Sequence, residues 1–294
     1  MDKLLSIDLG GTHLKSAVIY KNGEVTDKQT INTPATLQGL LNFVSDNTSD
    51  YFSGISLSVP GAVANTGIIY GNSAVPYIHG PNLKKLVYQK TNLPVEIEND
   101  ANCAAMAEVW RGNAKGKKDI VTIVLGTGVG GAILKNGIVH HGANLHAGEF
   151  GCMILNLDFA NKKKEIFSKV ASTSSLIRQV AKAKNINPEK LSGEKVFNLA
   201  ENGDEICIKC IQEFYYMISL GVYNLQYMFD PELILIGGGI SNREGLIANI
   251  KNELEKLIMD IDEATITPKL DRCLFVSDAN LIGAAYNFWK TNNL

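Results

Sequence analysis

The sequence predicts an α/β protein made of two related domains, and three observations support this prediction. Apolar runs typical of strands alternate along the chain with longer segments in which apolar residues recur at helical spacing. An arrangement of strand, glycine turn, strand and Asn-Gly turn occurs near the N-terminus and again in the middle of the chain. The 294 residues are also too many for one typical hydrophobic core.

The repeated arrangement follows directly from the residues. Its first copy begins at Leu9–Thr12 and ends at Lys21–Gly23, and its second begins at Leu125–Gly128 and ends at Lys135–Gly137. Asn-Gly between two apolar runs is a strong β-hairpin signal. Because the elements return in the same order and end in an identical Lys-Asn-Gly turn, they indicate a duplicated domain.

The other elements continue this alternation, and a small, polar and basic segment at Arg111–Lys118 indicates the domain boundary. We therefore expect an N-terminal domain at residues 1–114 and a C-terminal domain at 115–280, with a helix at about 281–294 packed back on the first. Strands are expected at Leu4–Leu9, Ser16–Tyr20, Ile55–Val59, Val95–Ile97, Ala132–Leu134 and Leu233–Ile236, and helices at Ala101–Trp110, Glu205–Tyr227, Gly245–Ile258 and Ile282–Trp289.

Composition and charge argue against several classes of protein. The chain is 45% hydrophobic and 20% charged, as is usual for globular proteins. Its net charge of −2 argues against a nucleic-acid-binding protein. It shows neither a signal peptide nor an apolar run long enough to cross a membrane, so we expect a cytoplasmic protein. The five cysteines are expected as free thiols.

The first glycine turn is a candidate phosphate site. Gly10 and Gly11 allow backbone N–H groups to approach a phosphate, and Thr12 and Lys15 add a hydroxyl donor and a cation. Asp8, at the end of a strand, is a candidate ligand of Mg²⁺ through water. An ordinary hairpin turn is the alternative interpretation.

The second glycine turn contains the GxGxxG pattern at Gly126, Gly128 and Gly131, with Thr127 inside it. A dinucleotide-binding site of that kind needs a helix to follow, whereas residues 132–134 continue as a strand. We therefore interpret the turn as a second phosphate site that acts together with the first.

A third glycine segment, at Gly237 and Gly238, follows a predicted strand. Its exposed backbone offers a flat surface for an adenine or a ribose. A strand-to-helix turn without a ligand explains it equally well.

Asn99 and Asp100 lie at a predicted junction between a strand and a helix. An amide side chain can donate to and accept from sugar hydroxyls, and a carboxylate can accept a hydroxyl proton. Capping of the helix is the alternative role for Asp100. Glu96 and Glu98 alternate with apolar residues and are interpreted as the polar face of the strand.

Glu149 lies in a glycine-flanked loop and is a candidate for binding two sugar hydroxyls. His146 and Glu149 are the second choices for the general base. Asp100 is preferred because a glutamate that contacts the sugar can bind it without receiving the proton.

In combination these motifs resemble the ROK family (repressors, open reading frames and kinases) of the actin/sugar kinase/Hsp70 superfamily, over about residues 4–288. Each motif is weak alone, but their order and spacing are specific. The resemblance rests on Asp8–Thr12, Glu98–Asn102, Leu125–Gly131, Ala147–Gly151, Ile236–Ser241 and Leu281–Ala285.

The resemblance implies an actin-like (ribonuclease H-like) fold with a cleft between its domains, which closes on ATP, Mg²⁺ and a sugar. It implies a homodimer and phosphorylation of the sugar 6-hydroxyl, with Asp100 as the base. The implied contacts are Gly61, Asn99, Asp100 and Glu149 to the sugar, Gly10, Gly11, Thr12, Gly126, Thr127 and Gly128 to the phosphates, and Gly237 and Gly238 to the nucleoside.

The sequence departs from the family in two places. Repressor members carry an N-terminal winged helix-turn-helix, for which there is no room before Asp8, so we expect no DNA binding. Many members also bind structural zinc through a histidine and a CxCGxxGCxE segment. Here Cys152 replaces the histidine and residues 153–164 contain no cysteine, so we expect no zinc.

The same region normally supplies a further sugar-binding glutamate. Ser168 falls at its position, and Glu165 lies three residues earlier. The sequence therefore leaves three alternatives open. The chain is a kinase of glucose, N-acetylmannosamine or another amino sugar, a kinase of β-glucosides that uses a wider pocket, or a sugar sensor without catalytic activity. The nucleotide preference also stays open.

Overall fold

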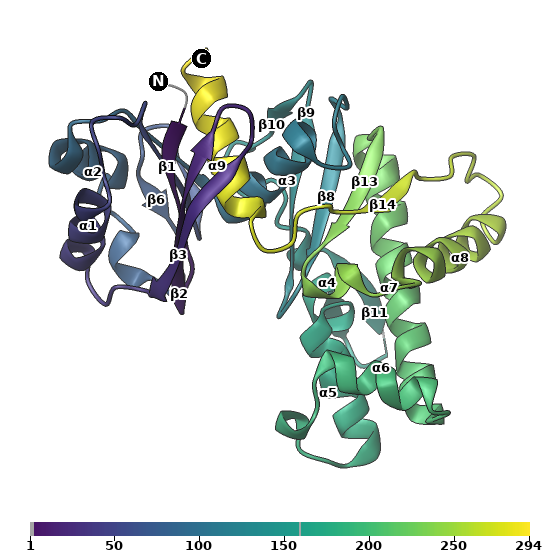
Figure 1. The fold of residues 1–294 in the computed structure, drawn as a ribbon. Helices are drawn as coiled ribbons and strands as arrows, with labels where there is room; N and C mark the ends of the chain where they lie inside the picture. The colour runs from purple at the N-terminus through teal and green to yellow at the C-terminus, as the bar shows by residue number, and fades with distance from the viewer. Residues whose placement is uncertain (1–2, 159) are drawn as a thin grey trace. The chain divides into compact units, whose positions relative to one another are not determined.

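The computed structural model describes residues 3–158 and 160–294, which form two compact units (Figure 1). Unit 1 comprises Met1–Gly116, His141–His146 and Ser277–Leu294, and unit 2 comprises Lys117–His140 and Ala147–Val276. The chain therefore leaves unit 1 and returns to it twice. The second return brings the C-terminal helix back to the unit in which the chain begins.

Unit 1 is built on a sheet with the strand order β3-β2-β1-β4-β7. β2 is antiparallel to both of its neighbours, whereas β1, β4 and β7 run parallel to one another. The strands are β1 (Lys3–Leu9), β2 (His13–Tyr20), β3 (Val25–Asn32), β4 (Ile55–Val59) and β7 (Val95–Asn99), and a separate ribbon contains β5 (Ala62–Val63) and β6 (Ile69–Tyr70).

Helices cover both faces of this sheet (Figure 1). α1 (Leu37–Asp46) and α2 (Leu83–Thr91) lie on one face, and α3 (Asp100–Arg111) and α9 (Ala279–Thr291) lie on the other. A short 3₁₀ helix, η1 (Pro76–Ile78), precedes α2.

Strand β1 is buried on both faces because helices lie on either side of it. Leu5 and Ile7 belong to the core beneath α1 and α2, whereas Leu4 packs with Phe288 of α9. Since side chains alternate along a strand, Ser6 and Asp8 point to the same face as Leu4. These two polar residues of β1 therefore face the start of α9, where each forms a hydrogen bond.

Unit 2 repeats the arrangement of unit 1 with the strand order β10-β9-β8-β13-β14. Again the first pairs are antiparallel and the last pairs parallel. The duplicated α/β fold predicted from the repeated glycine turns is therefore confirmed. The strands are β8 (Ile120–Leu125), β9 (Val129–Lys135), β10 (Ile138–Val139), β13 (Leu233–Gly237) and β14 (Leu270–Arg272).

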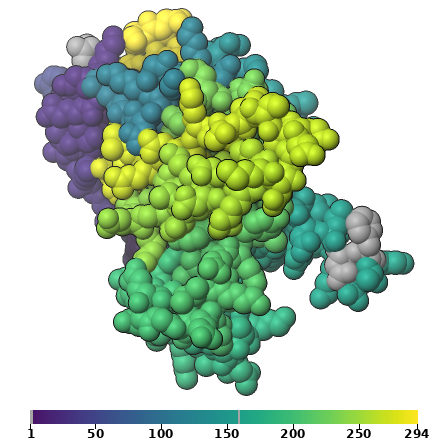
Figure 2. Space-filling model, turned by 90° about the vertical axis from the view of Figure 1, so that its right-hand side faces the viewer, coloured from purple at the N-terminus to yellow at the C-terminus, as the bar shows by residue number. Residues whose placement is uncertain are grey.

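The helices of unit 2 surround α7, which carries much of the hydrophobic core, including the buried Cys207 and Cys210. A hairpin of β11 (Ile154–Asp158) and β12 (Lys163–Ile166) extends away from the body of the unit (Figure 2). The helices are α4 (Phe167–Val170), α5 (Thr173–Lys184), α6 (Gly193–Glu201), α7 (Glu205–Phe229) and α8 (Leu246–Met259), with 3₁₀ turns η2 (Phe150–Cys152), η3 (Pro188–Lys190) and η4 (Gly239–Asn242). In the part of the chain that the structure describes, no helix combines the length and apolar character that crossing a membrane requires.

Candidate active site

Asp8 is the second-last residue of the buried strand β1 and is held by two neighbouring elements. Its Oδ1 accepts hydrogen bonds from Ser58 Oγ of β4 (3.1 Å) and from Asn280 Nδ2 of α9 (3.0 Å). Among residues 3–158 and 160–294, no group donates a hydrogen bond to its second oxygen, Oδ2. A carboxylate fixed through one oxygen in this way suits Mg²⁺, which prefers oxygen ligands and keeps much of its water.

The turn that follows Asp8 has the form expected of a hairpin. Gly10 N donates to His13 O (3.0 Å), and the side chain of Thr33 donates to Gly10 O (2.6 Å). Thr12 is exposed within this turn. Lys15 lies opposite Asp8 in the antiparallel register of β1 and β2. The Lys15 ammonium group donates to Ser277 O (3.4 Å), so this cation lies beside the segment that leads into α9.

Asn280 provides a test of the Asp8 cluster. If Asp8 holds Mg²⁺ as the sequence predicts, we expect Asn280→Ala to lower kcat/KM for MgATP by about tenfold, because loss of one outer partner lets this carboxylate turn. Asn292→Ala, at the other end of α9, removes a hydrogen bond to Phe288 O and should have little effect. Steady-state kinetics at varied MgATP make the comparison, and equal values for both variants would contradict the role of Asn280.

Asn99 and Asp100 lie at the end of β7 and the start of α3, as predicted. The N-cap, however, is Asn99, whose Oδ1 accepts from the backbone N–H groups of Ala101 (2.9 Å) and Asn102 (3.2 Å). Asp100 is the first helical residue, and its Oδ1 accepts from Ala101 N (2.8 Å). The alternative role of Asp100 as the helix cap was therefore wrong, since Asn99 performs it.

Gly61 lies beside this turn, because Asn99 Nδ2 donates to Gly61 O (3.1 Å). Two residues predicted to contact the sugar are thus brought together within unit 1. The imidazole of His79 packs against Gly61, where a Cβ atom would lie 2.9 Å from its Cε1. A side chain at residue 61 would therefore displace His79.

The prediction that Glu98 lies on a polar strand face was wrong. Glu98 is only 5% exposed, and its Oε2 lies 2.8 Å from His141 Nε2. It is buried because α3 covers this end of β7, where a strand face would otherwise meet solvent. The hydrogen bond from His141 raises the pKa of the imidazole above its usual value, although burial opposes the shift.

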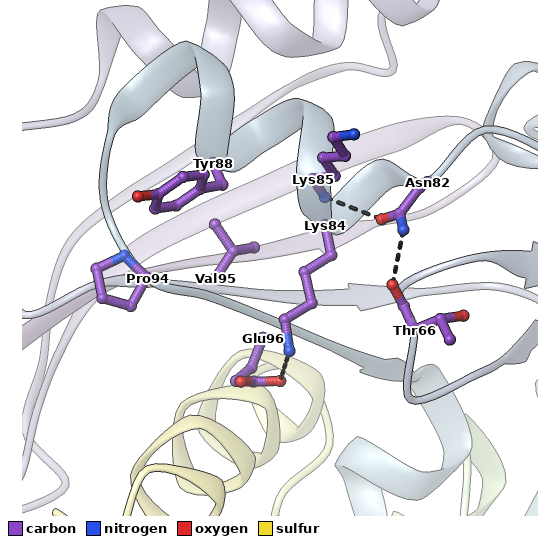
Figure 3. A pocket seen from close by; sticks show the side chains of 8 residues that line it. All are labelled: Thr66, Asn82, Lys84, Lys85, Tyr88, Pro94, Val95 and Glu96. Carbon is purple, nitrogen blue, oxygen red and sulfur yellow. Dashed lines mark hydrogen bonds and ion pairs between the residues drawn. The ribbon is translucent and has the colours of Figure 1, made fainter.

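Glu96 lies farther back on β7, away from these residues. Its carboxylate pairs with Lys84 of α2 (2.7 Å) at the side of a pocket of about 400 Å³ (Figure 3). Figure 3 also shows Asn82 capping the start of α2 and donating to Thr66 O, so the local polar groups bond to one another. This pocket contains none of the predicted site residues.

In unit 2, the glycine turn Gly126–Gly128 is closed by a hydrogen bond from Gly126 N to Gly128 O (2.9 Å). Ser168 supports the turn, because its Oγ accepts from Val129 N (2.9 Å) and lies close to Gly128. Glu165 lies on the exposed strand β12, where it accepts from Asn156 Nδ2 (2.8 Å). Ser168 thus forms its hydrogen bond at the glycine turn, whereas Glu165 forms its hydrogen bond within the β11–β12 hairpin.

A cavity of about 740 Å³ opens beside this turn, entirely within unit 2. Gly126 and Thr127 line one part of it, and Phe197 of α6 lines another. The guanidinium of Arg243 lies 4.1 Å from the centre of the Phe197 ring. A cavity of this volume lies within the range of sites that bind small molecules.

Gly237 is the last residue of β13 and Gly238 follows it, but neither lines this cavity. In this segment the first lining residue is Gly239. Gly238 has φ = 92°, and a Cβ atom there would lie 2.1 Å from Leu125 O. Gly238 therefore sets the close approach of β13 to β8. Sequence reasoning named neither Phe197 nor Arg243. Phe197 is 4% exposed and belongs to the hydrophobic core, so helix periodicity gives no sign that it also borders a cavity.

His146 and Glu149 are both exposed and lie close together in the chain, but they belong to different units. Glu149 precedes η2 in unit 2, and its side chain does not cap that turn. His146 belongs to unit 1, where its Nδ1 donates to Asn144 O (2.6 Å). In the described part of the chain, no group of three or more His, Cys, Asp or Glu side chains is arranged to hold a metal ion.

Comparisons with known proteins agree with the motifs. The ROK family model matches residues 4–291. A β-glucoside kinase of Listeria monocytogenes is 35% identical over 99% of each chain, and a glucokinase of Halalkalibacterium halodurans is 31% identical over 85% of this chain and 84% of its own. Among solved structures, a ROK family protein from Streptococcus pneumoniae in complex with sucrose superposes with a TM-score of 0.92, at 35% identity over 99% of each chain.

Proposed function

Because the chain belongs to the ROK family and is a carbohydrate kinase, we propose that it transfers the γ-phosphoryl group of ATP to the 6-hydroxyl of a β-glucoside. Of the sugars that the sequence left open, the β-glucosides are favoured by the relative named β-glucoside kinase, which matches over 99% of both chains. The similar structure that holds sucrose, a disaccharide, supports a pocket that accepts a second sugar ring.

The position and hydrogen bonding of Ser168 support a wider sugar pocket. This serine falls where ROK members have a sugar-binding glutamate, and its hydroxyl is bonded to Val129 of the glycine turn. A short side chain that is already hydrogen-bonded cannot replace the longer carboxylate. We infer that the sugar loses a polar contact there and that a substituent gains room.

In this proposal Asp100 is the general base. It accepts the proton of the sugar 6-hydroxyl as that oxygen attacks the γ-phosphorus, while the bond to the bridging oxygen breaks and ADP leaves. Asn99, Gly61 and Glu149 bind the sugar. Because phosphoryl transfer depends mainly on positioning and charge neutralisation, the fixed geometry of the Asn99–Asp100 turn is its main structural support.

The nucleotide is proposed to bind with its base in the 740 Å³ cavity of unit 2. Gly126, Thr127 and Gly128 would donate to the phosphates, as would Gly10, Gly11 and Thr12. Gly237 and Gly238 would shape the nucleoside side. Asp8 would hold Mg²⁺, which would neutralise charge on the phosphates, and Lys15 would add a second cation.

A substrate panel tests the choice of sugar. Purified protein is assayed with ATP and cellobiose, glucose, N-acetylmannosamine or N-acetylglucosamine in a coupled assay of ADP release. We expect kcat/KM for cellobiose to exceed that for glucose by about tenfold, because contacts to the second ring are made only by the disaccharide. A preference for glucose or an amino sugar would contradict the proposal, and binding without turnover would favour the sensor.

Two predictions from the sequence complete the proposal. We propose that the enzyme acts in the cytoplasm, where ATP is available, and that it is a homodimer. The location follows from the sequence features described above, and the homodimer from the resemblance to ROK kinases.

A further inference from the structure

Glu98 is the most buried carboxylate next to the proposed base, and the proposed mechanism does not use it. It precedes Asn99 and Asp100 on β7, and it is 5% exposed. Burial of a charged carboxylate is costly unless donors surround it. Three groups donate hydrogen bonds to the Glu98 carboxylate: the N–H of Asn99, the side chain of Asn102 and the side chain of His141.

One oxygen of Glu98 holds the catalytic turn. Oε1 accepts from the backbone N–H of Asn99 (2.7 Å) and from Asn102 Nδ2 (3.0 Å). The first bond fixes the peptide between residues 98 and 99, and the second ties it to the first turn of α3. The direction in which Asp100 leaves the strand therefore depends on where this carboxylate lies.

The other oxygen is held by His141 alone among the described residues. Its Nε2 lies 2.8 Å from Glu98 Oε2, and its side chain is 29% exposed. His141 begins the segment His141–His146, which belongs to unit 1 although the chain on either side of it belongs to unit 2. The Glu98–His141 hydrogen bond thus ties this segment to the strand that carries the turn.

We propose that His141 is a positioning residue for phosphoryl transfer, which acts through Glu98 to hold the Asn99–Asp100 turn in its reactive geometry. The proposal rests on the proposed function, because it assigns His141 to the site in which Asp100 acts as base. His141 donates to one carboxylate oxygen, and the other oxygen receives the N–H of Asn99. Neither residue exchanges a proton with the sugar.

Loss of His141 would change the position of the Glu98 carboxylate. Without His141, Oε2 of a buried carboxylate lacks a donor, and leaving a buried polar group unpaired is costly. The side chain gains by rotating toward water, and that rotation withdraws Oε1 from Asn99 N. A displacement of about 1 Å at reacting groups can lower the rate about 100-fold.

Three substitutions separate positioning from general loss of structure. We expect His141→Phe and His141→Ala to lower kcat for the sugar about 100-fold, with KM for ATP nearly unchanged. His141→Gln keeps a side-chain N–H donor and should stay within a few-fold of the wild type. His140→Gln is the matched control, because the adjacent His140 is exposed and its side chain forms no hydrogen bond with the described residues.

Two further measurements make the result independent of folding. Added imidazole should restore much of the activity of the His141→Ala variant, since it can donate into the space left by the side chain. Hydrogen exchange should show a faster-exchanging Asn99 amide in the Ala variant than in the wild type.

Full activity of His141→Ala would overturn the inference, and so would a loss that neither glutamine nor imidazole restores. Asp100→Asn separates the two proposals. If that variant is active, the proposed base is wrong, whereas an inactive Asp100→Asn beside an active His141→Ala refutes only the positioning role.

Discussion

Asp100→Asn is expected to lower kcat by about 10²–10⁴-fold, the usual contribution of a positioned general base. The amide is nearly the same size as the carboxylate, and its Oδ1 can still accept the hydrogen bond from Ala101 N. It cannot, however, accept the proton of a sugar hydroxyl. The thermal midpoint should therefore stay close to that of the wild type while turnover collapses.

The control for this substitution lies at the start of another helix. Glu205 is the first residue of α7 and follows the N-cap Asp204, just as Asp100 follows the N-cap Asn99. Removing a carboxylate at such a position costs about 0.3–1 kcal/mol of helix-dipole stabilisation. Glu205→Gln should lose stability of this order and no activity. If Asp100→Asn behaved in the same way, the assignment of the base would be wrong.

Gly283→Ala is expected to lower the free energy of unfolding by about 3 kcal/mol, the upper end of the usual cost of overpacking. Gly283 lies on α9, where a Cβ atom would meet Cys103 O of α3 at 1.7 Å. Alanine favours a helix over glycine by about 1 kcal/mol, so propensity alone predicts stabilisation. The clash involves backbone, which cannot move aside as a flexible side chain can, and it therefore decides the sign.

Chemical denaturation of the variants measures this difference. Gly130→Ala is the control, since apart from its two chain neighbours no described residue lies within 4 Å of a Cβ placed at Gly130. We expect its unfolding midpoint to be close to that of the wild type. A Gly283→Ala protein as stable as the wild type would show that α3 and α9 do not require so close an approach.

The fold was predictable because its signals are local. The two Asn-Gly turns lie where the sequence placed them, between β2 and β3 and between β9 and β10, and both Asn136 and Gly137 adopt positive φ. The strand Ile55–Val59 has the predicted bounds, since a short apolar run between turn residues has few alternatives. The long helix predicted at Glu205–Tyr227 extends only to Phe229.

The candidate site was predictable only in part, because some of its contacts join residues far apart in the chain. His141 is 43 residues from Glu98, and Asn280 is 272 residues from Asp8. Alternation along a strand assigned Glu98 to a solvent-facing side, since the pattern does not show which helix will cover it. These partners follow from the packing of α3 and α9, which no local pattern encodes.

The return of α9 to unit 1 has a consequence for synthesis of the protein on the ribosome. The hydroxyl of Ser6 bonds to Leu281 O, 275 residues later, and Leu4 and Ile19 pack against Phe288. Translation at about 5–20 residues per second separates these partners by some tens of seconds at the slow end of that range. During that interval the nascent first unit exposes the apolar surface that α9 later covers. Emergence of α9, rather than of either glycine turn, is therefore the event that completes the core of this unit.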